Sequence, residues 1–398
     1  KTVLCQNADS PFFYFGWPTV TRLPDGTLAM AASGFRLEHV CPFGKGVIAY
    51  SKDEGESWTH PAVVIDTPLD DRDCGLTCFG EGKVILTSFN NTTAFQRQCN
   101  ADRLLSSSAQ ERAKAELIEA YTRYVDAMGL QETYLGSTYC ISEDGGYRCG
   151  PVRKSPVTAP HGPCRMLDGS LLYVGRRFSA NDSFDDGAKP YIECWHMGTD
   201  GKEWQYVSSI ENVADEHGLL HSCEPHAIQL PDGKILVHLR MQRGGEHRVF
   251  TLYQSESMDG GKTFSPPHPL LGALGGAPAH LLLHSSGTLL SVYGHREAPY
   301  GIRAMFSRDG GNTWDTDYVL DAEGPSGDLG YPATVERRDG SLLTVYYENN
   351  GGQSRILQKI WRLRSEQKRG PMLEQVDKLA AELVQHYLDK DNPEAETL

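Results

Sequence analysis

Arginines stand directly after several apolar, extended segments of the chain. Arg36, Arg240 and Arg296 each follow a run rich in Leu, Val or Ala. A guanidinium group is a planar fork that holds a carboxylate through two hydrogen bonds, which the ammonium group of lysine cannot do. The chain has 38 Lys and Arg against 52 Asp and Glu, a formal charge of −14, so binding an acidic ligand requires a local arginine cluster. Whether these arginines meet depends on the elements that carry them.

Short turns built on glycine recur between the apolar runs. Asp-Gly between two extended runs indicates a tight hairpin, because glycine supplies the positive φ that the turn needs. The turn glycines are Gly26, Gly82, Gly169, Gly233, Gly287 and Gly340, separated by 56, 87, 64, 54 and 53 residues. This spacing predicts six similar β units.

A second repeat, S-x-D-x-G, runs in phase with the first. Its copies are Ser51–Gly55, Ser142–Gly146, Ser257–Gly261 and Ser307–Gly311, with a shortened copy at 199–204. In such a turn the aspartate caps backbone amides, and glycine adopts the turn conformation. An aromatic residue follows three of the copies and would pack beneath them. We therefore expect these boxes to stabilise the fold rather than to do chemistry.

The longest interval between turn glycines contains a predicted helical insertion. Ser108 and Glu111 have the spacing of a capping box, and apolar residues then recur with a helical period. Gly129 is a stop signal for this helix. We predict the insertion over residues 104–129.

The S-x-D-x-G copies resemble the Asp-box, or BNR repeat, of the sialidase (neuraminidase) superfamily, over about residues 10–365. The resemblance implies an all-β fold, a six-bladed β-propeller with four strands in each blade. We expect this catalytic domain to span residues 1–367. Residues 368–398 are expected to form an amphipathic C-terminal helix and a tail. The helix would dock on its own propeller or on a second copy of the chain in a homo-oligomer.

Two segments resemble the catalytic segments of sialidases. By this resemblance Glu224 activates the nucleophile, Arg240 binds the substrate carboxylate, Tyr331 is the nucleophile and Glu348 supports an arginine. A phenol suits an anomeric carbon that carries a carboxylate. An anionic nucleophile would be repelled there, whereas tyrosine can attack while a base removes its proton. The alternatives are a Glu–Arg ion pair that only ties two strands and a tyrosine that only packs in its strand.

Further arginines match substrate-binding positions of sialidases. Arg296 stands at the place of a triad arginine, with Arg303 as the alternative, and Arg36 matches a second triad position. Arg177 stands at the equivalent end of the third unit, where it would line the pocket or simply end a strand. The expected substrate-binding residues are Arg36, His39, Arg72, Arg177, His226, Arg240, Arg296 and Arg303.

An acidic loop, Asp70–Asp73, opens the second unit, where sialidases place an aspartate that contacts substrate. Three carboxylates around Arg72 repel one another, so partial burial with raised pKa values is expected. The alternative is a solvated acidic loop. Asp71 and Asp73 are predicted to be catalytic together with Tyr331 and Glu224.

The sequence departs from the sialidase pattern at two places. Many sialidases begin with an F-R-I-P strand whose arginine is the first triad member, but Phe15–Pro18 reads F-G-W-P. The loop that normally carries the acid/base aspartate, residues 37–45, contains no Asp. The candidate proton donors are the Asp70–Asp73 loop, which we favour, Glu38 and His39. These losses leave open an inverting mechanism, in which a carboxylate activates water.

The leading hypothesis is a retaining, exo-α-sialidase-like glycoside hydrolase that releases terminal sialic acid or a related 2-keto acid sugar from glycoconjugates. One alternative is a glycosidase or lyase for another sugar on the same scaffold. The other is a non-catalytic propeller that binds acidic glycans.

Composition also indicates which partners and cofactors to expect. The negative charge argues against a nucleic-acid partner, and no stretch approaches the roughly 20 apolar residues of a membrane span. Neither a metal-ligand cluster nor a phosphate-binding glycine loop is visible, so we expect no metal and no cofactor. The ten cysteines contain no C-x-x-C pair, and we interpret most as reduced core thiols, which favours a cytoplasmic protein.

Overall fold

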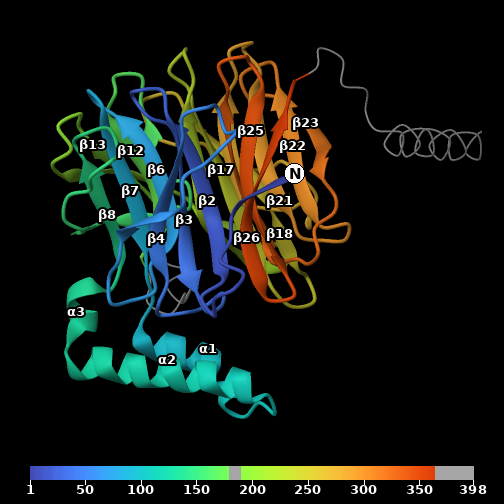
Figure 1. Cartoon of the computed structure of the whole chain (residues 1–398). Coiled ribbons are helices and arrows are strands. Elements are labelled where there is room, and N and C mark those ends of the chain that lie inside the picture. Colours follow the sequence, from blue (N-terminus) through green and yellow to red (C-terminus); the bar gives the residue numbers. More distant parts are fainter. Residues whose placement is uncertain (179–189, 364–398) are drawn as a thin grey trace, which may run out of the picture. The chain divides into compact units, whose positions relative to one another are not determined.

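The computed structural model describes residues 1–178 and 190–363, and Lys1–Trp361 form one compact unit. Within this unit, six antiparallel sheets are arranged as the blades of a β-propeller (Figure 1). The prediction of an all-β, six-bladed propeller is confirmed. The C-terminal helix and tail predicted over residues 368–398 lie outside the described residues.

The first three blades contain the strands from β2 to β14. Blade 1 consists of β2 (Tyr14–Arg22), β3 (Leu28–Arg36), β4 (Lys45–Ser51) and β5 (Ala62–Ile65). Blade 2 consists of β6 (Arg72–Phe79), β7 (Lys83–Phe89), β8 (Ser137–Ser142) and β9 (Arg153–Lys154). Blade 3 consists of β10 (Val157–Thr158), β12 (Leu171–Arg177), β13 (Ile192–Met197) and β14 (Trp204–Ile210), with β11 (Cys164–Arg165) also paired to β12.

The last three blades close the ring. Blade 4 consists of β16 (Gly218–Gln229), β17 (Ile235–Arg243), β18 (Val249–Ser257) and β19 (His268–Pro269), with β15 (Val213–Asp215) paired to β16. Blade 5 consists of β20 (Ala279–Leu283), β21 (Leu289–His295), β22 (Gly301–Ser307) and β23 (Asp315–Asp321). Blade 6 consists of β24 (Leu329–Glu336), β25 (Leu342–Asn350), β26 (Gln353–Trp361) and β1 (Thr2–Cys5). The N-terminal strand therefore completes the last blade.

Both sequence repeats occupy equivalent places in the blades. The six turn glycines have φ values between 74° and 92°, and each precedes the second strand of its blade. The S-x-D-x-G boxes follow the third strand. In the box of blade 5, Ser307 Oγ donates to Asp309 and accepts from the Gly311 N–H, both at 2.8 Å. Trp314 then donates to Gln254 of blade 4 at 2.8 Å, so this box also ties neighbouring blades together.

Apolar layers between neighbouring blades form the core. Between blades 1 and 2, for example, Ala31 and Ile48 pack with Leu76 and Leu86. Seven of the ten cysteines are buried, as predicted for core thiols.

Three helices interrupt blade 2 between β7 and β8 and lie at one end of the blades (Figure 1). They are α1 (Thr93–Leu104), α2 (Ala109–Ala127) and α3 (Leu130–Tyr134). Ser108 caps α2 by accepting from the Glu111 N–H, and Gly129 follows with a φ of 64°, as predicted. The predicted start at residue 104 is wrong, because α1 precedes it.

The reason that α1 escapes sequence analysis is its buried face. That face consists of Thr93, Gln96 and Asn100, so no apolar stripe marks the helix. Over the described ranges, none of the helices combines the length and apolarity needed to cross a membrane.

Candidate active site

Strand direction gathers the predicted site residues at one end of the propeller. The first and second strands of a blade are antiparallel, so the start of one lies beside the end of the other. In blade 1, Tyr14 at the start of β2 pairs with Arg36 at the end of β3. By the same geometry, β16 brings Glu224 close to Arg240 of β17 in blade 4.

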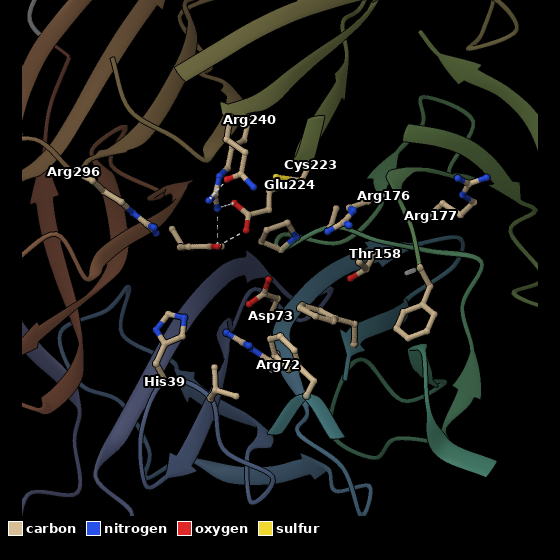
Figure 2. Close-up of a pocket in the computed structure, with 18 residues that line it drawn as sticks. His39, Arg72, Asp73, Thr158, Arg176, Arg177, Cys223, Glu224, Arg240 and Arg296 are labelled. Atoms are coloured by element: carbon tan, nitrogen blue, oxygen red, sulfur yellow. Dashed lines mark hydrogen bonds and ion pairs between the residues drawn. The ribbon is translucent and has the colours of Figure 1, made fainter. Parts of the chain in front are cut away.

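This end of the propeller carries a pocket of about 360 Å³, to which all six blades and α1 contribute (Figure 2). A pocket of this size is within the range of small-molecule sites. Its charged, aromatic and amide lining residues are His39, Arg72, Asp73, Phe89, Phe95, Arg176, Arg177, Phe178, Glu224, Arg240, Gln242, Arg296 and Tyr331.

Three of these side chains project from bulges in the first strands. Asp73, Glu224 and Tyr331 have φ values of 50°, 47° and 48°. Each stands where the register between the first and second strand shifts. A bulge re-aims a side chain, and the left-handed backbone costs a non-glycine residue on the order of 1–2 kcal/mol. Blades 2, 4 and 6 thus present reactive groups from equivalent, strained positions.

A hydrogen-bonded chain links three lining residues of the pocket, Tyr331, Glu224 and Arg240, of which Figure 2 labels the last two. The Tyr331 hydroxyl donates to Oε1 of Glu224, and Nη1 of Arg240 lies 2.5 Å from Oε2 of the same carboxylate. Arg240 Nη1 also donates to Tyr331 Oη at 3.4 Å. The second nitrogen of this guanidinium, Nη2, donates to Gln242 at 2.5 Å. Glu224 therefore contacts both a phenol proton and a fixed cation.

Burial and charge set different protonation states in the Tyr331–Glu224 pair. Burial raises the pKa of Tyr331 well above its usual value, and the charges of Glu224 and Asp73 add to this effect. Burial alone would also raise the pKa of Glu224, but Arg240 and the hydrogen bond from Tyr331 hold it below its usual value. At neutral pH the phenol is protonated and the carboxylate is ionised. These are the starting states of a nucleophile and its base.

Arg296 faces the same phenol from blade 5. Its Nε donates to the Leu329 carbonyl at 3.1 Å, and its guanidinium carbon lies 5.4 Å from the centre of the Tyr331 ring. Its Nη2 is buried and makes no hydrogen bond to the described residues. This donor can serve a bound anion, because an unpaired buried donor is otherwise unfavourable.

Arginines outnumber carboxylates in the pocket lining. Among the described lining residues, Arg72, Arg176, Arg177, Arg240 and Arg296 stand beside two carboxylates, Asp73 and Glu224. The described part of the lining therefore contains more guanidinium groups than carboxylates. Such a site favours an anionic ligand.

Two predicted arginines lie outside the pocket lining, and their assignment to substrate is wrong. Arg36 is fully buried and pairs with Asp70 at 2.6 Å. Arg303 belongs to the third strand of its blade, β22, and donates to the carbonyls of Asp321 and Pro299 at 2.8 and 3.1 Å. Arg296, which directly follows the second strand, is the arginine that reaches the pocket.

The predictions for the acidic loop and for Glu348 also need correction. Asp71 is buried outside the pocket lining, where it accepts from the N–H and hydroxyl of Thr67 at 2.6 and 2.9 Å. Its raised pKa, about 7, comes chiefly from burial. Of the predicted carboxylates in that loop, only Asp73 lines the pocket. Glu348 pairs with Arg355 and Lys1 rather than with a pocket arginine.

His226 also lies outside the pocket lining. It packs with His161 and His280, whose ring centres lie 5.6 and 4.3 Å away, and accepts from the Leu281 N–H at 2.9 Å. Burial lowers the pKa values of all three histidines. Within the part of the chain that the structure describes, no group of three or more His, Cys, Asp or Glu residues is placed to hold a metal ion.

Sequence reasoning missed several lining residues. Arg176 lines the pocket beside Arg177, although alternation along a strand directs attention to only one of them. Phe95 comes from α1, the helix that the hydrophobic pattern did not reveal. Gln242 stands two residues beyond Arg240 and so on the same face of β17, which is the signal that could have identified it.

Comparison with known proteins defines the class. The profile of the BNR repeat-like domain matches residues 132–344, more than half of the sequence, and the chain belongs to this family within the sialidase superfamily. A comparison with curated protein sequences gives no match.

Solved structures share the fold. A protein of unknown function from Dyadobacter fermentans is 21% identical, with a TM-score of 0.68 over 91% of this chain and 98% of that one. An intramolecular trans-sialidase from Ruminococcus gnavus is 14% identical, with a TM-score of 0.59 over 89% and 96%. An α-L-arabinofuranosidase from Fusarium graminearum is 16% identical, with a TM-score of 0.61 over 92% and 98%. At these identities the likeness is one of fold.

Proposed function

We propose that the protein is an exo-α-sialidase-like glycoside hydrolase that releases terminal sialic acid or a related 2-keto acid sugar from glycoconjugates. The observation that carries the proposal is the hydrogen bond from Tyr331 to Glu224 in a pocket that also holds Arg240 and Arg296. The phenol has its base in contact, and the base is held ionised by a cation. The neighbouring guanidinium groups suit a substrate with its own carboxylate.

In the first chemical step, the phenol oxygen of Tyr331 attacks the anomeric carbon while Glu224 takes the phenol proton. The bond to the leaving-group oxygen breaks, and a glycosyl–tyrosine intermediate forms. Arg296 and Arg240 hold the sugar carboxylate, so the negative charge stays away from the attacking oxygen. Water then attacks from the face that the leaving group vacated, which gives net retention.

Pocket size supports removal of a single terminal sugar. A cavity of about 360 Å³ holds one acid sugar and part of the next residue rather than a long glycan. Phe95 of α1 and Phe178 after β12 form apolar parts of the lining and suit contacts with a sugar ring or an aglycone. Activity on chain ends is therefore the expected mode.

The test is proton NMR of a digest of α2,3- and α2,6-sialyllactose, recorded from the first minutes of reaction. We expect free sialic acid whose α-anomer appears first and then mutarotates. First release of the β-anomer would establish inversion and remove Tyr331 as the nucleophile.

Two further arms of that test address the alternatives. Release of arabinose from an aryl α-L-arabinofuranoside, with sialyllactose intact, would favour a neutral-sugar glycosidase. Saturable binding of sialyllactose without any cleavage would favour a glycan-binding propeller. Either result overturns the proposed activity.

A further inference from the structure

The proposed reaction needs a proton donor for the leaving group, and His39 is a titratable side chain that lines the pocket. It belongs to the segment between β3 and β4, residues 37–44, and lines the pocket on the blade 1 side, across from Glu224 and Arg240 (Figure 2). Its side chain is 47% exposed. Arg36 fixes this segment by donating to the carbonyls of Glu38 and His39 at 3.3 and 2.8 Å.

A chain of hydrogen bonds defines which nitrogen of His39 faces the substrate. Tyr14 Oη lies 2.9 Å from His39 Nδ1 and 3.0 Å from a carboxylate oxygen of Asp328. Tyr14 has one hydroxyl proton, and the carboxylate is the stronger acceptor, so Nδ1 of His39 carries a proton and donates to Tyr14. Nε2 is then the nitrogen that gains and loses a proton. It makes no hydrogen bond to the described residues.

Asp328 is held ionised behind this chain. Burial would raise its pKa, but His39, Asn349 and Tyr347 hold the pKa below its usual value. Tyr347 and Asn349 donate to Asp328 at 2.7 and 2.9 Å. Asp328 Oδ1 also lies 3.4 Å from His39 Nδ1, so the carboxylate acts on the imidazole both directly and through the Tyr14 hydroxyl. This arrangement orients the ring and stabilises its charged form.

The other candidate proton donors are less suitably placed. Glu38 is buried and pairs with Arg103, and neither Asp70 nor Asp71 lines the pocket. Asp73 lines the pocket, but at 6% exposed it is far less open to a departing group than the His39 side chain, which is 47% exposed. We propose that His39 is the general acid and base of the reaction, with Tyr14 and Asp328 as its positioning residues. This assignment rests on the proposed function.

His39 gives up one proton in the first step and regains one in the second. As Tyr331 attacks, the proton on His39 Nε2 passes to the glycosidic oxygen, and the leaving group departs as an alcohol. Neutral His39 then removes a proton from the incoming water while the bond between the sugar and Tyr331 breaks. Glu224 returns the phenol proton to Tyr331, and the site is restored.

His39 also predicts a pH dependence. Partial burial in the pocket, together with Arg72 and Arg36, lowers the pKa of His39 below its usual value, against the opposing effect of Asp328. The other group in direct contact, Tyr14, keeps its proton because burial raises its pKa well above the usual range. Since the acid form of His39 is required, kcat/KM should fall as pH rises through the His39 pKa.

The test compares His39→Asn with the wild type on two substrates that differ in leaving group. Loss of a general acid should lower kcat/KM for sialyllactose by roughly 10²–10⁴-fold, because lactose must be protonated to depart. The loss of kcat/KM for 4-nitrophenyl sialoside should be at least tenfold smaller. In the His39→Asn variant, the fall of kcat/KM at alkaline pH should disappear. Equal losses on both substrates, or an unchanged fall at alkaline pH, would overturn the assignment.

Asp73→Asn is the matched control, because among the described residues Asp73 is the other candidate donor that lines the pocket. We expect its losses to be alike on the two substrates. If Asp73→Asn shows the leaving-group dependence and His39→Asn does not, Asp73 is the acid. A wild-type protein that cleaves neither sialoside overturns the proposed function itself, and the His39 assignment with it.

A second measurement does not depend on turnover. NMR titration of the His39 ring, assigned by comparison with His39→Asn, reports its pKa directly. Asp328→Asn and Tyr14→Phe should each lower that pKa relative to the wild type. An unchanged pKa in both variants would show that the chain from Asp328 does not act on His39.

Discussion

The Tyr331 hydroxyl donates a hydrogen bond to the Glu224 carboxylate, although 107 residues separate the two in the chain. Neither lies in the neighbouring blade of the other, and each projects from a bulge with a φ near 48°. The ring of blades therefore positions a base against a nucleophile that no local motif could bring together. Arg240 binds the same carboxylate, so the pair functions only while three strands keep their places.

Replacement of Tyr331 should separate chemistry from binding. Tyr331→Phe removes the attacking oxygen but leaves the ring in place, so kcat on 4-nitrophenyl sialoside should fall at least ~10²-fold with little change in the Kd of a sialic acid analogue. Tyr346→Phe is the control, since its hydroxyl donates to a carboxylate, Asp321, outside the pocket lining. Full turnover by Tyr331→Phe would exclude this tyrosine as the nucleophile.

Substitutions of Arg296 and Arg303 should differ in how far they reduce the preference for a substrate that carries a carboxylate. Loss of the charged hydrogen bonds from Arg296 in Arg296→Gln should lower kcat/KM about 10- to 100-fold for a sialoside. The methyl ester of the same sialoside should lose much less, because it has no carboxylate. Arg303→Gln removes a buried guanidinium that contacts backbone carbonyls, so it should lower Tm and keep the preference for the acid. A preference for the acid that survives in Arg296→Gln would contradict the assigned contact.

Turn chemistry made the fold predictable from sequence, whereas the site was predictable only in part. The hydrogen bonds of Gly311 and Asp309 in the turn join residues that lie four positions apart in the chain. The sequence pattern of the turn is therefore sufficient to predict it. Arg36 and Arg240 both lie in the last part of second strands, but Arg36 forms a buried ion pair with Asp70 instead of reaching the pocket. This ion pair joins the end of a blade 1 strand to the segment before blade 2. The residues close to Arg36 in the sequence therefore do not predict it.

Asp71 should make stability fall as pH rises. Burial raises the pKa of Asp71 from 3.8 to about 7, so the folded state favours the protonated acid. Its contribution to stability is fully present below pH 3.8 and is lost as pH rises through about 7. Asp71→Asn cannot ionise. The unfolding free energy of the variant relative to the wild type should therefore increase across this window, by on the order of 4 kcal/mol. Urea unfolding at pH 4 and pH 8 measures the difference, and a pH-independent difference would contradict the burial argument.

Arg36 and Asp70 should behave as a coupled pair inside the protein. Both side chains are fully buried, and Arg36 Nη2 lies 2.6 Å from Asp70 Oδ1. Asp70 also accepts a hydrogen bond from Gln96 of α1 at 2.8 Å. Removing one charge leaves the other uncompensated, so Arg36→Met should lower the unfolding free energy by about 3–5 kcal/mol. The double variant Arg36→Met, Asp70→Leu should recover part of that loss.

Arg148→Met is the matched control for this cycle, since Arg148 pairs with Asp144 at the surface and should leave the urea midpoint nearly unchanged. If the losses of unfolding free energy in Arg36→Met and Asp70→Leu simply add up in the double variant, the two side chains are not coupled. Because Arg36 also holds the carbonyl of His39, the folded Arg36→Met protein should lose more activity on sialyllactose than on 4-nitrophenyl sialoside. An equal loss on both substrates would show that the buried pair stabilises the blade without positioning the proton donor.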